Sequence, residues 1–305
     1  MRRAALLVCL LSVLVASGGA GCPRALSRYT PAGPRVLPTT ATLEDVTRAV
    51  NDNSARIQSI ACSDASISTP GIPTLRANVA IERPRRLRVR AETAITGTEA
   101  DIGSNDELFW FWMKRMPEPG VYFCRHDQFA TSPMKQLLPI EPEWIIDAAG
   151  LASFEPGGKH TGPYPVRGGK LEIRTERDTP SGPQTKITVV DEQRALVLEQ
   201  HLYDARGTRI ASSITTQHYR DPVSGAYVPR EIELQVPATQ FSITMRLKTV
   251  QVNQPNIGAA PTFALPNYPG ASPVDLANPR QPIAPAATPT VSAPRQRAAF
   301  PAAQY

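Results

Sequence analysis

The feature that most constrains this chain is a change in its hydrophobic period near residue 61. Before that point, residues 43–60 repeat apolar side chains at helical spacing, which predicts one amphipathic helix. After it, apolar and polar residues alternate in short segments that are separated by turns rich in Pro, Gly and Asp. The alternation predicts antiparallel strands at residues 65–67, 78–81, 86–92, 108–113, 121–124, 170–176, 185–190, 196–203, 210–219, 227–236 and 241–252.

A second, shorter helix is predicted at residues 143–148, between Pro142 and Gly150. A helix buries its apolar side only against another element, so we expect both helices to pack on the sheet. Large antiparallel sheets twist and curl. We therefore expect a mainly β, α+β fold, in which a large curved antiparallel sheet forms a half-open barrel and helices cover its concave face. An eleven-strand sandwich is the alternative, and the long first helix counts against it.

Charge and proline content divide the chain into a domain and its flanks. The whole chain carries +6, but residues 41–252 hold 25 Lys and Arg against 26 Asp and Glu, so we do not expect this domain to bind nucleic acid. Residues 253–305 contain 11 prolines and few large apolar residues, which predicts a disordered tail. If part of this tail packs on the domain, Phe263 and Tyr268 are the expected contacts.

The first residues have the pattern of an export signal. Two arginines precede an apolar run at residues 4–16, which as a helix spans about 20 Å and is too short for a ~30 Å hydrocarbon core. Residues 1–21 are therefore predicted to be a signal peptide. The small residues before Cys22 resemble the lipobox of bacterial lipoproteins, with Gly19 where leucine is usual. That resemblance implies that Cys22 is acylated, and residues 22–40, with four prolines, then form a tether. A soluble secreted protein is the alternative.

Two cysteines remain once Cys9 is removed with the signal peptide and Cys22 is acylated. In an oxidising compartment Cys62 and Cys124 can form one disulfide, or they can remain two separate buried thiols. No Cys and His set has the spacing of a structural zinc site, so neither a metal nor a cofactor is predicted.

The predicted strand at residues 108–113 is almost wholly apolar. Alternation places Leu108, Trp110 and Trp112 on one of its faces and Phe109, Phe111 and Met113 on the other. Such a strand is either core on both faces or one wall of an acyl-chain cavity between sheet and helices. The candidate ligand-binding residues for that cavity are Leu108, Trp110, Trp112, Val46, Val50, Ile57 and Trp144.

The stretch GSNDELFWFW at residues 103–112, with the Arg-rich segment 83–88 before it and residues 121–127 after it, carries a family resemblance. Together with the order of anchor, helix and hairpins, it resembles the superfamily of the lipoprotein carrier LolA and its receptor LolB. In particular, it is similar to an uncharacterised group of outer-membrane lipoproteins related to them. The resemblance covers residues 41–252. It implies a half-barrel that binds lipoprotein acyl chains in the bacterial cell envelope, at the outer membrane and facing the periplasm.

These observations predict a monomeric protein, anchored to the membrane through lipidated Cys22, that binds an amphiphile or a lipoprotein acyl chain and takes part in lipoprotein sorting. Two alternatives remain, an envelope sensor or protein-binding scaffold with the same fold, and a hydrolase. The sequence contains no GxSxG, HExxH, P-loop or GxGxxG motif, so we do not expect an enzyme.

Overall fold

The computed structural model describes residues 33–129, 132, 142–179, 182–255 and 262–278. The described residues from Val36 onward belong to one compact unit. The predicted signal peptide and the predicted anchor Cys22 lie outside the described residues. The elements are α2 (Leu43–Ala55), β1 (Ser59–Thr69), β2 (Ile72–Glu82), β3 (Arg86–Thr93), β4 (Gly97–Ser104), β5 (Leu108–Met113), β6 (Gly120–Arg125), α3 (His126–Phe129), α5 (Pro142–Ile146), η1 (Asp147–Leu151), β7 (Lys159–Val166), β8 (Lys170–Thr179), β9 (Gly182–Asp191), β10 (Val197–Tyr203), β11 (Arg209–Thr216), β12 (Tyr219–Arg220), β13 (Tyr227–Val228), β14 (Glu231–Val236), η2 (Pro237–Thr239), β15 (Phe241–Arg246), β16 (Gln251–Val252) and β17 (Ser272–Asp275).

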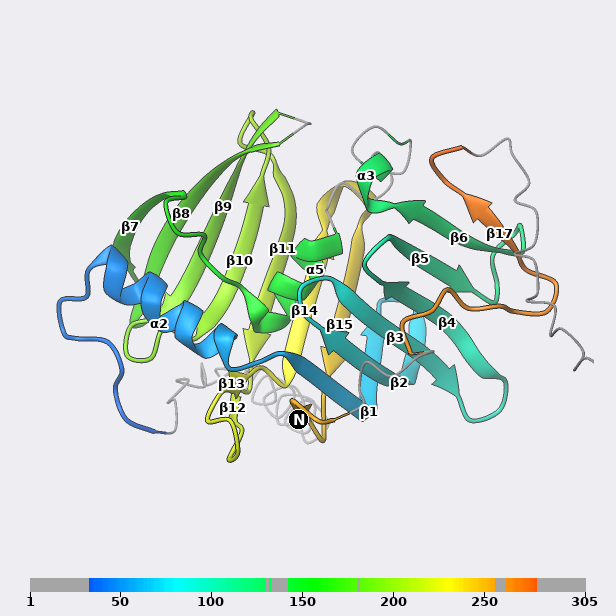
Figure 1. Cartoon of the computed structure of the whole chain (residues 1–305), viewed down its shortest axis with the longest axis horizontal. Helices are drawn as coiled ribbons and strands as arrows, with labels where there is room; N and C mark the ends of the chain where they lie inside the picture. The colour runs from blue at the N-terminus through cyan, green and yellow to red at the C-terminus, as the bar shows by residue number, and fades with distance from the viewer. Residues whose placement is uncertain (1–32, 130–131, 133–141, 180–181, 256–261, 279–305) are drawn as a thin grey trace, which may run out of the picture. The chain divides into compact units, whose positions relative to one another are not determined.

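One large curved sheet dominates the unit (Figure 1). Its strands follow the order β17-β6-β5-β4-β3-β2-β1-β15-β14-β11-β10-β9-β8-β7, and β16 pairs with the start of β1. Neighbouring strands are antiparallel except for β17, which runs parallel to β6. The predicted mainly β fold with a large curved antiparallel sheet is therefore confirmed. The sandwich alternative is wrong, because the predicted strands join one continuous sheet.

Helix α2 begins where the sequence predicts and ends earlier. Thr42 and Asp45 cap its first turn reciprocally, since the Asp45 amide donates to Thr42 Oγ1 (3.2 Å) and the Thr42 amide donates to Asp45 Oδ2 (3.0 Å). The helix stops at Ala55, and the chain enters β1, where Ile60 pairs with both β2 and β16. Helical spacing continued to Ile60 in the sequence, but pairing with two strands decides its conformation.

The helices pack on one face of the sheet, which we call the helix face. Residues of α5 and η1 are buried against β1, β2 and β3, and α2 is buried against β8, β9 and β10 (Figure 1). Cross-strand partners point to the same face of a sheet, so the register assigns every strand residue to the helix face or to the opposite, outer face. Val79 and Ile81 of β2 lie in the cluster that contains η1 and define the helix face for β2 to β6.

Part of the predicted disordered tail is ordered, which corrects that prediction. Residues 262–271 pack on the outer face near β3 to β6, and β17 follows at the edge of the sheet beside β6 (Figure 1, orange). Beyond β17, Leu276 and Ala277 pack with Phe109 and Cys124, which lie on the helix face. Phe263 and Ala271 are buried. Proline-rich composition predicted disorder, but a proline segment is also extended, and a short extended segment can pair with the edge of a sheet. Residues beyond 278 lie outside the described chain.

Candidate functional site

Four of the predicted ligand-binding residues are core residues in separate clusters. Val46 and Val50 of α2 are buried against β8, β9 and β10. Ile57 is buried in a second cluster with β1, β2 and β3, and Trp144 of α5 is buried in a third with β10, β11 and β14. The structure therefore does not bring these four side chains together around one cavity. They pack directly on three different parts of the sheet.

The other three predicted residues, Leu108, Trp110 and Trp112, lie on the outer face, away from the helices. Alternation along β5 fixes this, since their neighbour Phe111 is aligned with the helix-face residues of β4. Trp110 is fully buried, and all three pack in a cluster with residues 265–271. The prediction that this tryptophan face lines a ligand cavity below the helices is wrong. The chain's own C-terminal segment covers it.

On the helix face, an apolar row crosses five strands and is only partly covered. Pairing of β2 with β3, β3 with β4, β4 with β5 and β5 with β6 places its members side by side. All of them except the first, which is buried, are partly exposed. The members of this apolar row are Val79, Val89, Ile102, Phe111 and Tyr122.

A second row lies beside the apolar row on the same face, two residues away on each of the strands β2 to β5. It consists of three alanines, Ala77, Ala91 and Ala100, in line with Met113, whose side chain is 41% exposed. Alanines fill little space beside the larger residues of the apolar row, so the two rows together present a continuous apolar surface. This surface is our candidate functional site.

The apolar row carries no charge at neutral pH. Burial raises the pKa of Tyr122, with a smaller contribution from Glu118, and the Tyr122 hydroxyl donates to the Glu118 carbonyl (2.8 Å). The arginines of β3 alternate to the outer face, where Arg88 forms an ion pair with the fully buried Asp101 (2.7 Å). Charge on these strands is thus kept on the face opposite the candidate site.

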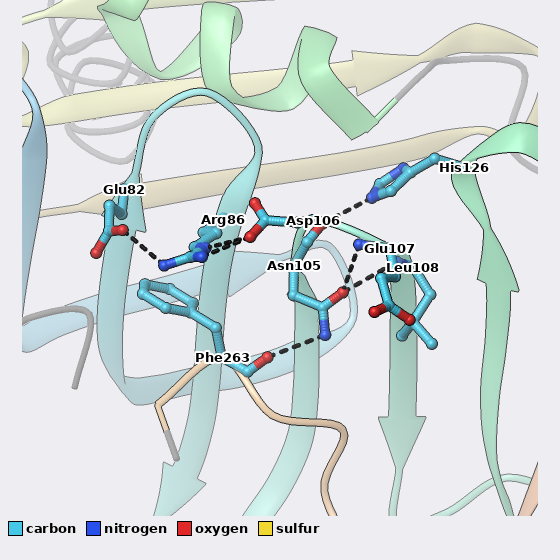
Figure 2. A network of polar contacts seen from close by, with 8 residues as sticks. All are labelled: Glu82, Arg86, Asn105, Asp106, Glu107, Leu108, His126 and Phe263. Atoms are coloured by element: carbon cyan, nitrogen blue, oxygen red, sulfur yellow. Dashed lines mark hydrogen bonds and ion pairs between the residues drawn. The ribbon is translucent and has the colours of Figure 1, made fainter. Parts of the chain in front are cut away.

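The motif that carries the family resemblance forms the turn from β4 to β5 (Figure 2). Asn105 organises it, because its Oδ1 accepts from the amides of Glu107 (2.9 Å) and Leu108 (3.0 Å). The His126 ring nitrogen Nε2, at the start of α3, lies 2.9 Å from the Asn105 carbonyl and supports the turn. The turn fixes the register of β5, and therefore which of its aromatic residues join the apolar row.

Two further contacts stabilise this motif. Arg86 bridges Glu82 (2.8 Å) and Asp106 (Figure 2). The hydrogen bond from Arg86 is the main cause that lowers the pKa of Asp106 from its usual value. Gly103 lies under the Trp110 ring, so a Cβ at this position would be 2.1 Å from the indole. The motif residues thus have conformational roles, and none of these contacts forms a catalytic arrangement.

Of the two alternatives for Cys62 and Cys124, the disulfide is not formed. Cys62 and Cys124 are both free and buried, and burial raises the pKa of each thiol. Cys62 lies on β1 and Cys124 on β6, with four strands between them. Five strand spacings amount to about 24 Å along the sheet, far beyond the ~7 Å that a disulfide spans between α-carbons. The alternative of two buried thiols is the one observed.

Among the described residues, no three His, Cys, Asp or Glu side chains gather closely enough to hold a metal ion. In that same part of the chain, no helix is both long and apolar enough to cross a membrane.

No protein-family model and no curated protein matches the chain. Among solved structures, it is similar to a putative outer membrane lipoprotein-sorting protein domain from Vibrio parahaemolyticus, with 12% identity, a TM-score of 0.48, and coverage of 70% of this chain and 94% of that one. It is also similar to a LolA superfamily protein from Nitrosomonas europaea, with 10% identity, a TM-score of 0.41, and coverage of 70% and 95%. A third is a DUF1329 family protein from Desulfovibrio piger, with 12% identity, a TM-score of 0.42, and coverage of 68% and 93%.

These similarities concern the fold alone. The curved antiparallel sheet with helices on one face agrees with the half-barrel that the resemblance at residues 103–112 leads us to expect.

Proposed function

We propose that this protein binds one acyl chain of an amphiphile along the apolar row, without covalent chemistry. The observation that carries the proposal is the continuous line of uncharged side chains across five strands on the helix face, of which all but the buried Val79 are partly exposed. Four strand spacings make this line about 19 Å long. An acyl chain that buries about a dozen methylenes gains roughly 10 kcal/mol before the costs of association, so no polar contact is needed for useful affinity.

The sequence also indicates where in the cell this binding would take place. Acylated Cys22, after export by the signal peptide, anchors the domain in the bacterial envelope, at the outer membrane and facing the periplasm. Residues 22–40 then tether the domain within reach of lipid-modified proteins. The acyl chains of such lipoproteins are the ligands that we propose, with a role for the protein in their sorting, as a monomer that carries out no catalysis.

The experiment is a titration of the full chain with a fluorescent fatty-acyl probe. Ile102→Asn places a polar group in the middle of the apolar row and should weaken binding roughly tenfold or more, because a buried isoleucine contributes about 1.5–3 kcal/mol. The matched control is Ile95→Asn, the same substitution at a side chain that is 94% exposed in the turn between β3 and β4. This control should bind as the unmodified chain does.

A second variant distinguishes a loss of binding from a loss of folding. Met113→Gln changes a partly exposed side chain in the neighbouring row, and we expect weaker probe binding at an unchanged melting temperature. Failure of the folded chain to bind any acyl probe, or equal binding by Ile102→Asn and Ile95→Asn, contradicts the proposed function.

A further inference from the structure

Residues 262–278, which we call the strap, contact the outer face of β3, β4 and β5 through three polar groups of the sheet. Arg88 Nη1 donates to the Thr262 carbonyl (2.8 Å), and Asn105 Nδ2 donates to the Phe263 carbonyl (3.2 Å; Figure 2). The carboxylate of Asp101 accepts from the Tyr268 hydroxyl (2.7 Å). The strap is thus held at two main-chain carbonyls and one side chain.

Each of these three groups is also fixed by the sheet itself. Arg88 uses Nε and Nη2 on Asp101 (3.1 and 2.7 Å), which leaves Nη1 for the strap. Asn105 uses Oδ1 to close the turn between β4 and β5, which leaves Nδ2 for the strap. Donors and acceptors that are already oriented lose little entropy when a ligand arrives, and this is the arrangement of a binding site.

The outer face recognises one strap side chain, that of Tyr268, through two contacts. Its ring stacks on Trp112 with 3.9 Å between centroids and 11° between planes, while its hydroxyl reaches Asp101. Asp101 is fully buried, so a residue that stacks without a hydroxyl leaves a carboxylate oxygen with one hydrogen bond fewer. The contacts at Thr262 and Phe263 are to carbonyls, which every residue carries, so they select an extended backbone and no particular sequence.

The strap also joins the edge of the sheet as a peptide ligand does. β17 pairs in parallel with β6 over four residues, from Ser272 opposite Gly120 to Asp275 opposite Phe123. Addition of an extended peptide to a sheet edge gives affinity through the main chain, and neighbouring side-chain contacts give specificity. Pro266, Pro269 and Pro273 cannot continue a helix and favour the extended form.

We propose that this outer face is a peptide-docking surface, occupied here by the strap as an intramolecular ligand. The partner that it fits is an extended, proline-containing peptide that adds in parallel to β6 and places a tyrosine on Trp112. Such a peptide displaces the strap. The proposal concerns the outer face and does not require acyl-chain binding. Only the last strap residues, Leu276 and Ala277, reach the helix face, where they pack with Phe109 and Cys124.

The test uses the full chain with a protease recognition sequence in place of residues 256–261. The chain is folded first and then cut, which leaves the strap attached only by its contacts. We expect the fragment from residue 262 onward to co-elute with the sheet in gel filtration. Excess synthetic peptide of residues 262–278 should then displace it, whereas the same peptide with Tyr268→Ala should compete roughly tenfold less well or worse.

Because the substitution is in the peptide, it does not affect folding of the protein. A Tyr268→Phe peptide separates the two contacts of this residue, since it keeps the stack on Trp112 and loses the hydrogen bond to Asp101, and we expect intermediate competition. Equal competition by the unmodified and Tyr268→Ala peptides overturns the proposal. So does a cut chain whose sheet unfolds, shown by circular dichroism, or one whose fragment excess peptide never displaces, because the strap is then a permanent part of the core.

Discussion

The rings of Trp112 and Tyr268 stack almost in parallel, with their centroids 3.9 Å apart. Trp112 belongs to the strand that the sequence singles out as a ligand wall, and Tyr268 belongs to the segment whose composition predicts disorder. Each residue is the principal aromatic partner of the other. This pair explains why an aromatic face lies away from the helices without being exposed to solvent.

Loss of the Tyr268 hydroxyl is expected to destabilise the folded chain. Tyr268→Phe keeps the ring on Trp112 but removes the hydrogen bond to buried Asp101, which should cost about 1–2 kcal/mol in urea denaturation. Tyr164→Phe is the matched control, because this side chain is 45% exposed, and its free energy of unfolding should change by less than about 0.5 kcal/mol. Equal stability of the Tyr268→Phe chain and the unmodified chain would show that the contact contributes nothing.

The same tyrosine should make stability fall at alkaline pH. Burial, followed by the hydrogen bond to Asp101, raises the pKa of Tyr268 to about 12. The neutral phenol is therefore favoured in the folded state, and its contribution is present below about pH 10 and lost as the pH rises from 10 to 12. Phenolate absorbance should show fewer groups titrating near pH 10 in the folded chain than in the unfolded chain, since the pKa of Tyr122 is raised as well. Tyr268→Phe should reduce this difference between the folded and unfolded titrations by one group.

Gly103 should not tolerate a side chain. Gly103→Ala places a Cβ 2.1 Å from the Trp110 ring, and we expect a loss of about 3 kcal/mol or a failure to fold. In a Trp110→Leu background, which removes the ring, the same substitution should cost much less. A double-mutant cycle measures this coupling, and additive effects would mean that the ring does not restrict position 103.

His218 should contribute to a loss of stability in acid. Burial lowers the pKa of His218 to about 4, so its neutral form is favoured in the folded state. Its contribution is present above about pH 6.5 and lost as the pH falls from 6.5 to 4, by up to about 3 kcal/mol. His218→Gln takes up no proton and should flatten the free energy of unfolding over that interval. The pKa of Glu199, lowered to about 2 chiefly by its hydrogen bond with His201, affects stability only at lower pH.

Alternation in the sequence predicts most strands, because it reports directly which residues are half-buried. It misses β4, whose sequence GTEADIGS has few apolar residues and whose conformation depends on β3 and β5 beside it. Alternation also shows that Trp110 and Trp112 share a face. It does not show which face the helices cover, since that depends on the register set by the turn at Asn105. The candidate site on the helix face therefore contains Phe111 of β5, whereas the sequence predicted a site lined by Trp110 and Trp112, which lie on the outer face.

The pairing of β1 with β15 and β16 has a consequence for the order in which the chain folds. Ser66 pairs with Arg246 and Ile60 pairs with Val252, so the second neighbour of β1 is made only near the end of the domain. During synthesis from the N-terminus, the hairpins from β1 to β6 can form early, but one edge of β1 then remains unpaired. Such an edge recruits other chains, and contacts this distant in sequence form slowly. Until residue 252 has emerged, we therefore expect the unpaired edge of β1 to make the nascent chain prone to aggregation.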